Sequence, residues 1–590
     1  MQGGFIWDDD AHVTQNPCLR TGEGLYRIWF EPGAVQQYYP LTYTVFWLEY
    51  HLWHLQPFGY HLVNLLLHAF NAILLWRVLG WLVIPRAWFA AAIFALHPVH
   101  VESVAWISEL KNVLSGFFYL AAILAYIRFA GLDLDHRDDH AVAESPSSKS
   151  NDGRWRFYIT ALSLFLCALL SKTITCSLPV AILLLLWWKR DRLVWREMAP
   201  LLPFFILGAA LGLATPWIEK RHYIDVGGSP DWTLSLLDRC LIAGRALCFY
   251  AAKLFWPDKL TFIYPRWQID VGIWWQYLFP FAVLIVLIIL WFFRRKIGKA
   301  PLVAVAFSIM TLAPALGFFD IYPMRYTFVA DHYQYLASTG LIGLFCVMMS
   351  IGFRWCGRRQ KSAESIAWSA LLFILGMLVW RQGHVYKDVE TLWKDTVTKN
   401  PGCWLAHDHL GVMLLRTGQL EKAGQRFSRA LQLNPGYREA HHNLGIVLLQ
   451  QGKIEEAIIR FTTALKLRPN FPEAHSDLAV ALYRQATSTS SGLVPNGVEG
   501  QGKLEEAIEH LFEAMRLAPD YADARNNLAV LLMEQGKILA EQNQLEQATL
   551  RFRKALRLKP DFPEARARLE AALIQQEIFE SHKQGRPPKT

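Results

Sequence analysis

Residues 274–299 read WWQYLFPFAVLIVLIILWFFRRKIGK, a long apolar run that ends in a cluster of cationic side chains. A helix rises about 1.5 Å per residue, so roughly 20 apolar residues cross the ~30 Å hydrocarbon core of a bilayer. A helix also satisfies its own backbone hydrogen bonds in that environment. The stretch therefore predicts a membrane span followed by a basic cluster on one side of the membrane.

Stretches of the same kind recur from residue 59 to about residue 381, separated by short polar joints. The stretch 174–188 is short, and the stretch 87–106 ends in the polar run HPVHVESVAW, so we expect only its first half to span. The sequence predicts a polytopic membrane domain of about ten spans at 59–381. They lie near residues 59–80, 87–106, 110–130, 155–171, 174–188, 199–216, 274–293, 301–319, 335–353 and 364–381.

The composition of the whole chain averages two unlike parts. The 590 residues are 53% hydrophobic and 18% charged, and the mean hydropathy is +0.18. Soluble proteins carry about 25% charged residues, so an ordinary soluble enzyme is excluded, yet the values are too mild for a chain buried wholly in a membrane. Ordinary numbers of Gly (37) and Pro (28) and only 8 Cys exclude a disordered chain, a collagen and a disulfide miniprotein.

From residue 404 onward the pattern changes to short amphipathic helices with Gly and Pro at fixed intervals. Gly411 and Pro435 recur 34 residues later, and this period, with a Pro closing each unit, resembles the tetratricopeptide repeat. In the third and fourth units, aligned on Leu478-Ala479 and Leu528-Ala529, we expect 16 and 7 extra residues between the two helices. The repeat domain at 386–580 comprises a half repeat at Tyr386–Pro401, four repeats and a capping helix at 564–580, and a tail follows at 581–590.

The net charge is +9, from 59 Lys and Arg against 50 Asp and Glu. In a soluble protein this balance would point to nucleic acid, but in a membrane protein the cations mark the loops that stay in the cytoplasm, and no nucleic-acid partner is expected. If every basic cluster is cytoplasmic, the spans between clusters come in even numbers, provided that the helical stretch 236–256 lies in the membrane plane. The clusters are Arg77/Arg86, Lys189–Arg196, Arg294–Lys299 and Arg354–Lys361.

This parity places the acidic start of the chain, residues 1–58, on the extracytoplasmic side, where the repeats also emerge. Nothing in the sequence carries residues 1–58 across. We expect a first helix to precede them, and the alternative is that the short N-terminus is translocated as a tail. Within them, residues 41–56 carry Glu49 and two His and predict an interfacial helix, which either flanks a lipid-entry groove or anchors the chain on the surface. The other extracytoplasmic segments are 97–103, 217–273 and 320–334.

The first candidate group is Trp7 with the three adjacent carboxylates Asp8, Asp9 and Asp10, in the first extracytoplasmic segment. Such carboxylates repel one another, so at least one requires a cation, a proton or a basic substrate nearby. A solvated acidic turn is the alternative.

A second candidate group surrounds Pro98, which would end or kink an apolar helix. Backbone groups freed in this way are tolerated in a membrane where they line a polar cavity. His97, His100 and Glu102 are therefore candidate substrate-binding residues. As metal ligands they lack a standard zinc spacing, and an interfacial structural role is the remaining alternative.

A third group lies in MRYTFVADHYQYLAS, where Arg325, Asp331 and Tyr335 surround an aromatic-rich entry into a span. Arg is a good phosphate ligand because its planar fork donates two parallel hydrogen bonds. Arg245 and Lys253 on the in-plane stretch add two cations on the same side that could hold a lipid phosphate.

The motifs together resemble the transmembrane and tetratricopeptide-repeat-containing proteins, with wording closest to their bacterial relatives. They are FIWDDDAHVTQNP, HPVHVESVAW, FYAAKLFWP and RYTFVADHYQYLAS, followed by the repeats. That family resembles the GT-C superfamily of glycosyltransferases, whose animal members are implicated in O-mannosylation of extracytoplasmic proteins.

The resemblance implies an all-α chain, with a polytopic membrane domain of GT-C type followed by a repeat α-solenoid, as a multi-pass protein of the bacterial inner membrane. It implies transfer of a mannose-like sugar from a polyprenyl-phosphate donor to a hydroxyl of an extracytoplasmic polypeptide that the repeats hold. Either Asp8 or Asp9 would be the general base. No cofactor is expected beyond the donor substrate, and a divalent metal is not expected to be obligatory.

Two departures from the family pattern bear on the donor. His332 stands where the family often has Arg, and Ala337 stands where it often has Pro. If the missing Arg binds the donor phosphate in the family, Arg325 would have to replace it here.

Two alternative functions stay open at the level of sequence. In the first, the chain is a non-enzymatic, membrane-anchored scaffold whose repeats recruit partner proteins, and Asp8 and Asp9 are dispensable. In the second, it is an enzyme like an O-antigen ligase or polymerase, which would require a diphosphate-lipid donor and a glycan acceptor.

Overall fold

The computed structural model describes residues 3–132, 151–190, 192–219, 234–319, 322–354, 360–488 and 498–583. Every regular element in these ranges is a helix, so the predicted all-α fold class is confirmed. The chain divides into two units, Met1–Pro401 and Gly402–Thr590. We call them the membrane unit and the repeat unit.

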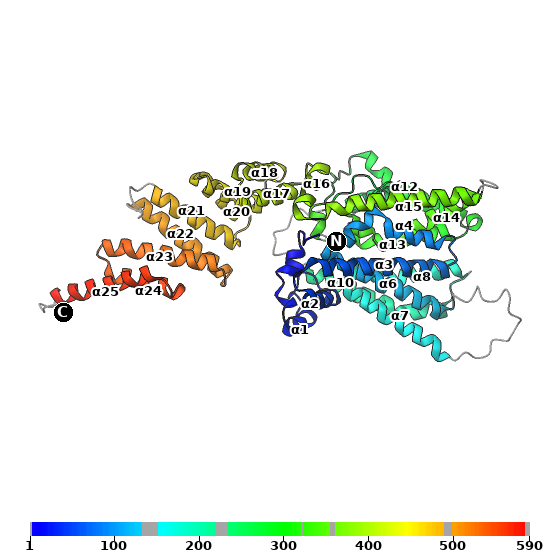
Figure 1. The fold of residues 1–590 in the computed structure, drawn as a ribbon, viewed down its shortest axis with the longest axis horizontal. Helices are drawn as coiled ribbons and strands as arrows, with labels where there is room; N and C mark the ends of the chain where they lie inside the picture. Colours follow the sequence, from blue (N-terminus) through cyan, green and yellow to red (C-terminus); the bar gives the residue numbers. More distant parts are fainter. Residues whose placement is uncertain are drawn as a thin grey trace. The chain divides into compact units, whose positions relative to one another are not determined.

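Among the described residues of the membrane unit, six helices are long and apolar enough to cross a membrane. Figure 1 shows α3, α6 and α8 running alongside one another, and α6 packs against both α3 and α8. Three further apolar helices are shorter, α8 (Leu178–Lys189), α13 (Ala300–Leu312) and α14 (Ser338–Arg354). The six are α3 (Pro57–Trp81), α6 (Leu110–Ala130), α7 (Asn151–Ser171), α10 (Leu202–Glu219), α12 (Leu278–Ile297) and α15 (Gln360–Val385).

The stretch 87–106 is a broken helix, as its sequence predicts. α4 (Ala87–Leu96) ends two residues before Pro98, a single 3₁₀ turn follows, and α5 (Val101–Ala105) continues at an angle of 52°. Proline lacks the N–H that would continue the α-helical ladder, and its ring clashes with the preceding turn. If the two pieces form one span, the count of candidate spans rises to seven.

Shorter helices cover the ends of the membrane unit. A π-helical turn at Asp10–Thr14 leads to α1 (Gly22–Phe30) and α2 (Pro40–Trp53). α11 (Leu236–Phe255) begins with a capping box between Ser235 and Asp238 and is not one of the six candidate spans. α11 lies against α12, where a Cβ atom on Gly244 would stand 2.5 Å from the backbone of Pro280, so only glycine permits this close approach.

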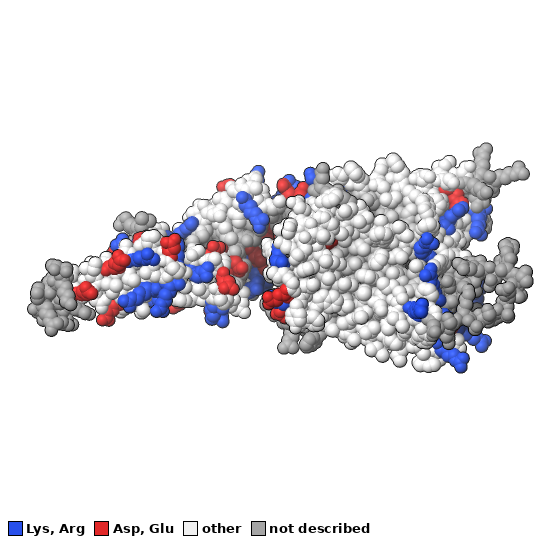
Figure 2. All heavy atoms as spheres, turned by 60° about the horizontal axis from the view of Figure 1, so that its bottom comes forward, with Lys and Arg blue, Asp and Glu red and all other residues white. Residues whose placement is uncertain are grey.

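Three of the four predicted basic clusters lie at one end of the membrane unit. Lys189 donates to the carbonyl oxygen of Leu82 at 2.8 Å, and Lys299 donates to that of Trp187 at 3.1 Å. Arg86 pairs with Glu364, at the start of α15, through two hydrogen bonds of 2.7 and 2.9 Å. In Figure 2, Lys and Arg gather at this end, and a broad uncharged surface adjoins them.

The repeat unit consists of helical hairpins, as its 34-residue period predicts. The first two hairpins have first helices of 13 residues and second helices of 14 residues. α25 (Pro563–Lys583) follows the last hairpin. The hairpins are α17 (Trp404–Arg416) with α18 (Leu420–Leu433), α19 (Arg438–Gln450) with α20 (Ile454–Leu467), α21 (Pro472–Ser488) with α22 (Val498–Leu517), and α23 (Ala522–Glu541) with α24 (Leu545–Leu558).

The fourth hairpin corrects the alignment made from sequence. The seven extra residues do not lie between its helices but lengthen α23, which has 20 residues. Gly536, not Ala529, lies against the ring of Phe552, as Gly445 lies against that of Phe461. Seven residues make about two helical turns, so the insertion preserves the buried face of the helix. The extra residues of the third hairpin fall mostly outside the described part of the chain.

Gly445→Ala is expected to destabilise the second hairpin by about 1–3 kcal/mol, because an added Cβ atom would lie 2.6 Å from the Phe461 ring. The measurement is amide hydrogen exchange of α19 and α20 in the full chain. Gly424→Ala in α18 is the matched control, since its Cβ atom meets Val447 at an ordinary 3.5 Å, and Ala favours a helix over Gly. Equal protection in the two variants would contradict the prediction.

Candidate functional site

The two candidate catalytic carboxylates occupy different environments although they are adjacent. The carboxylate of Asp9 is fully buried and accepts hydrogen bonds from the backbone N–H groups of Ile6 and Ser108, each at 2.8 Å. The side chain of Asp8 is 27% exposed, accepts a hydrogen bond from the Ser108 hydroxyl at 2.9 Å and lies 3.4 Å from Nε2 of His12. Asp9 therefore fixes the loop, whereas Asp8 is left accessible.

The same environments separate the pKa values of the two groups. Burial raises the pKa of Asp9 well above its usual value, and the charge of Asp8 raises it further. Burial also acts to raise the pKa of Asp8, but His12, Lys111 and the Ser108 hydrogen bond outweigh it and hold that pKa below its usual value. At neutral pH Asp8 therefore carries the negative charge, as a general base requires.

Trp7 precedes these carboxylates in a left-handed backbone conformation, with φ of +44°. Its ring stacks on Trp106 at a centroid distance of 5.6 Å and meets the rings of Phe262, Tyr326 and Trp393 edge-on at 5.2 to 6.4 Å. A non-glycine residue seldom adopts such a φ unless its surroundings hold it there. The aromatic rings supply that constraint immediately before Asp8.

A buried ionic cluster lies at the start of α6, next to Ser108. Glu109, with a side chain 1% exposed, pairs with Lys111 at 3.0 Å and with Lys172 at 3.5 Å. Asn112 donates to Glu109 and accepts a hydrogen bond from Lys172 at 2.7 Å. Charged groups at such depth are stable only when they are paired and hydrogen-bonded, which these are.

Two further carboxylates extend the polar region toward the segment 322–338. Glu102 accepts hydrogen bonds from the ring Nδ1 and the backbone N–H of His332, at 2.9 and 3.2 Å. Tyr264 donates to Asp331, whose two carboxylate oxygens both lie 3.0 Å away. Burial and then the charge of Glu102 raise the pKa of Asp331 well above its usual value. Asp331 is thus suited to hold a proton rather than to remove one.

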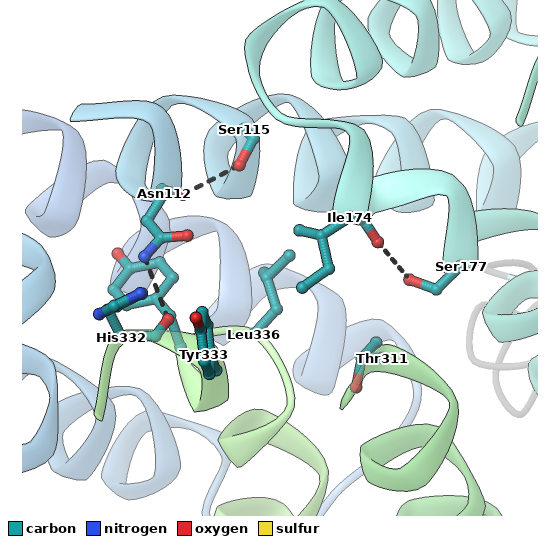
Figure 3. Close-up of a pocket in the computed structure, with 9 residues that line it drawn as sticks. Asn112, Ser115, Ile174, Ser177, Thr311, His332, Tyr333 and Leu336 are labelled. Atoms are coloured by element: carbon teal, nitrogen blue, oxygen red, sulfur yellow. Dashed lines mark hydrogen bonds between the residues drawn. The ribbon is translucent and has the colours of Figure 1, made fainter. Parts of the chain in front are cut away.

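A narrow polar pocket adjoins the ionic cluster. Its walls combine the amide of Asn112, the hydroxyls of Ser115, Ser177 and Thr311, and the side chain of His332. Figure 3 shows Asn112 beside His332 and Tyr333, on the side of the pocket away from Ser177 and Thr311. Asn112 and Ser115 lie on α6, and Ser108, which donates to Asp8, lies in the 3₁₀ turn directly before that helix.

The remaining histidine and tyrosine candidates are engaged in internal hydrogen bonds. His97 donates from Nε2 to the carbonyl oxygen of Leu254 at 2.9 Å. His100 donates from Nδ1 to that of Phe94 at 2.8 Å, and its Nε2 lies 3.0 Å from the Ser338 hydroxyl. Tyr335 lies between His68 and Asn71 at 2.8 and 3.0 Å. Of the predicted His-Pro-x-His-x-Glu group, only Glu102 joins the site. We assign the two histidines to holding the broken helix.

The three candidate cations lie in different places. The Arg245 guanidinium lies over the rings of Trp267, Trp275 and Phe279, and no contact among the described residues joins it to Asp8 or Asp331. Lys253 lies 5.5 Å from the ring of Tyr264, the partner of Asp331, and donates to the carbonyl oxygen of Asp258. Arg325 contacts the ring of Tyr326, which in turn contacts Trp7.

Sequence reasoning passed over several residues of this site. Glu109, Lys111 and Lys172 stand at the edges of apolar stretches, where ionisable residues are expensive and mark function by default, so the signal was present. Trp7 and Trp393 gave no such signal, because Trp is abundant in the chain. Within the described part of the chain, no group of three or more His, Cys, Asp or Glu is arranged to hold a metal ion.

A family model described as a TPR repeat matches residues 411–452, 447–485 and 501–536. This chain is 33% identical over 162 residues to protein O-mannosyl-transferase Tmtc3 of Drosophila melanogaster, which covers 22% of this chain and 17% of the relative. It is 26% identical over 489 residues to protein O-mannosyl-transferase TMTC1 of Homo sapiens, which covers 73% of this chain and 53% of the relative.

A solved structure of a thermophilic TPR protein from Thermus thermophilus matches 29% of this chain and 99% of its own, at 24% identity and a TM-score of 0.19. This chain spans less than two thirds of the length of the protein O-mannosyl-transferases to which it is similar. The chain thus carries tetratricopeptide repeats and resembles the TMTC protein O-mannosyl-transferases, as its motifs predict.

Proposed function

We propose that the chain is a membrane glycosyltransferase that moves a mannose-like sugar from a polyprenyl-phosphate donor to a hydroxyl of a polypeptide. The observation that carries the proposal is the division of roles between Asp8 and Asp9, one accessible and ionised, the other buried. The similarity to protein O-mannosyl-transferases supports the same reaction class.

In this proposal Asp8 removes the proton from the acceptor hydroxyl. The hydroxyl oxygen then forms a bond to the anomeric carbon of the sugar, while the bond from that carbon to the phosphate oxygen breaks. The phosphate leaves with the bonding electron pair, and the proton stays on Asp8 until water accepts it. Lys111 and His12, which hold Asp8 in its ionised form, keep the base ready.

The leaving phosphate requires cations, and Lys253 and Arg325 are the candidates nearest to the site. Burial lowers the pKa of Lys253, and the charge of Asp258 acts to raise it. Arg325 lies next to the aromatic cluster around Trp7 and makes no ion pair among the described residues, so it is free to take a phosphate. Arg245, enclosed by aromatic rings, is not assigned to the donor.

We further propose that the catalytic end of the membrane unit and the repeats share the extracytoplasmic side. α3 begins beside Gly3, which accepts from His61, and ends beside Lys189, so the site and the basic clusters lie at opposite ends of that helix. Loops rich in Lys and Arg stay in the cytoplasm, which leaves the other end outside. A reporter fused after residue 401 is expected to report the extracytoplasmic side, and a cytoplasmic signal would overturn this orientation.

The test of the reaction is transfer by the purified full chain in liposomes. Radiolabelled mannose on polyprenyl phosphate is supplied with a Ser- and Thr-containing peptide, and label on the peptide is the expected result. Absence of transfer from any polyprenyl-phosphate hexose would overturn the proposal. Transfer of an oligosaccharide from a diphosphate lipid to a glycan would identify the ligase or polymerase alternative, and an inactive chain whose repeats still capture a partner would identify the scaffold.

A further inference from the structure

The segment Tyr386–Pro401, predicted from its period as a half repeat, packs onto the candidate site of the membrane unit. The backbone carbonyl oxygen of Lys387 accepts a hydrogen bond from the backbone N–H of Gly4 at 3.0 Å. Lys399 donates to the carbonyl oxygen of Leu260 at 2.7 Å, and Asn400 donates to that of Ile263 at 3.1 Å. One backbone hydrogen bond and two from side chains to backbone carbonyls therefore bind the segment to the start of the chain and to the loop that carries Tyr264.

Trp393, on α16 (Val389–Lys399), is the residue of this segment that reaches the catalytic loop. Its side chain is fully buried, with its ring 6.2 Å from that of Trp7 and 5.6 Å from that of Phe262. Phe262 in turn meets Trp7 at 5.2 Å and Trp106 at 5.0 Å. The rings of Trp7, Trp106, Phe262 and Trp393 form one aromatic cluster, which we call the tryptophan box. Within it, Trp393 contacts Trp7 and Phe262.

The conformation of Trp7 depends on this box. A left-handed backbone at a bulky residue costs on the order of 1–3 kcal/mol and persists only when the surroundings over-determine it. Edge-to-face and stacked aromatic pairs each contribute about 0.5–1.5 kcal/mol beyond the area that they bury, so a few of them offset that cost. Loss of one ring removes part of this stabilisation and allows the backbone of Trp7 to leave its left-handed conformation.

We propose that Trp393 is a positioning residue for the transfer reaction, which acts on the Asp8 carboxylate through Trp7. The proposal rests on the proposed function in assigning Asp8 to catalysis. Because Trp7 and Asp8 are consecutive, a change of φ at Trp7 rotates the backbone that carries Asp8. A shift of the order of 1 Å in a reacting group lowers its rate by about 10²-fold.

Trp393→Ala is therefore expected to lower kcat about 10- to 100-fold, while the KM for the peptide stays within about 2-fold. A fall in kcat without a change in KM is expected when only the geometry of the transition state is disturbed. Trp393→Phe keeps an aromatic ring in the box and is expected to recover most of the lost kcat. The assay uses the full chain in liposomes with polyprenyl-phosphate mannose and the Ser- and Thr-containing peptide.

Trp368→Ala is the matched control. Trp368 is equally buried in the membrane unit, where it stacks on Phe89 at 4.7 Å and donates to Glu364, far from the tryptophan box. Its loss is expected to lower the thermal stability of the chain but to leave kcat unchanged. An equal fall of kcat in Trp368→Ala and Trp393→Ala would overturn the proposal, as would a wild-type kcat in Trp393→Ala.

A second readout separates this proposal from the proposed function. Amide hydrogen exchange over residues 3–16 is expected to accelerate at least 10-fold in Trp393→Ala and to stay at the wild-type rate in Trp368→Ala. If the wild-type chain transfers no sugar, the proposed function fails, while accelerated exchange still supports the coupling between Trp393 and the Asp8 loop. Unchanged exchange in Trp393→Ala overturns the coupling whatever the activity.

Discussion

Asp8→Asn is expected to lower kcat for sugar transfer by about 10²–10⁴-fold, the usual contribution of a general base. Asn keeps the shape of the side chain but cannot accept the proton of the acceptor hydroxyl. Because the pKa of Asp8 is held below its usual value, the base form exists throughout the neutral range. Activity of the wild-type chain should therefore fall only at acid pH, and the variant should lose this acid limb.

Two neighbouring substitutions serve as controls. Asp10→Asn removes an exposed carboxylate whose described side-chain partner is the Thr14 hydroxyl at 2.8 Å, and it is expected to leave kcat unchanged. Asp9→Asn retains one of the two acceptors that bind the backbone of Ile6 and Ser108, so it should cost about 1–3 kcal/mol of stability. If Asp9→Asn abolished transfer in folded protein while Asp8→Asn did not, the roles of the two carboxylates would be reversed.

The elements of the fold follow from local patterns, which is why the sequence predicts them well. Apolar length predicted the long apolar helices of the membrane unit, of which six or seven are candidate spans among the described residues. Pro98 predicted the break between α4 and α5, and the 34-residue period predicted the repeat hairpins. Each of these signals is contained in a short window of residues. The expected position of the seven extra residues in the fourth hairpin was wrong, because a length difference does not say whether a loop or a helix absorbs it.

Local sequence patterns cannot show which distant segments of the chain contact one another. The segment Tyr386–Pro401 has the periodicity of a repeat, yet its hydrogen bonds go to Gly4, Leu260 and Ile263, more than 130 residues away along the chain. The separation of Asp8 from Asp9 likewise depends on Ser108, about 100 residues later. The resemblance therefore pointed to the acidic pair but left open which member is the base.

The candidates that the structure separates were chosen by residue type rather than by surroundings. Arg245 looked like a phosphate ligand because Arg often is one, but three aromatic rings occupy the space around its guanidinium. His97 looked like a ligand because it follows an apolar helix, but it accepts from the Val99 N–H on one nitrogen and donates to the Leu254 carbonyl with the other. Both are cases in which packing decided the role.

Glu109→Gln is expected to destabilise the membrane unit by about 3–5 kcal/mol, because it leaves the buried ammonium groups of Lys111 and Lys172 without their shared carboxylate. Lys172→Met should cost less, since Glu109 keeps Lys111 at 3.0 Å. The double variant should be more stable than Glu109→Gln alone, because it removes the lysine that Glu109→Gln strands. The measurement is thermal unfolding of the detergent-solubilised chain, read as a double-mutant cycle.

The exposed pair Arg27–Glu31, joined at 2.7 Å on α1, is the control for this cycle. Water and salt screen such a pair, so Glu31→Gln is expected to have no measurable effect on unfolding. Additive losses in the cycle at Glu109 and Lys172 would mean that the two groups do not interact in the folded chain. If the coupling energy is positive and Lys172→Met retains its kcat, the cluster serves stability. If kcat falls by more than the loss of folded protein explains, the cluster takes part in the reaction that Asp8 performs beside it.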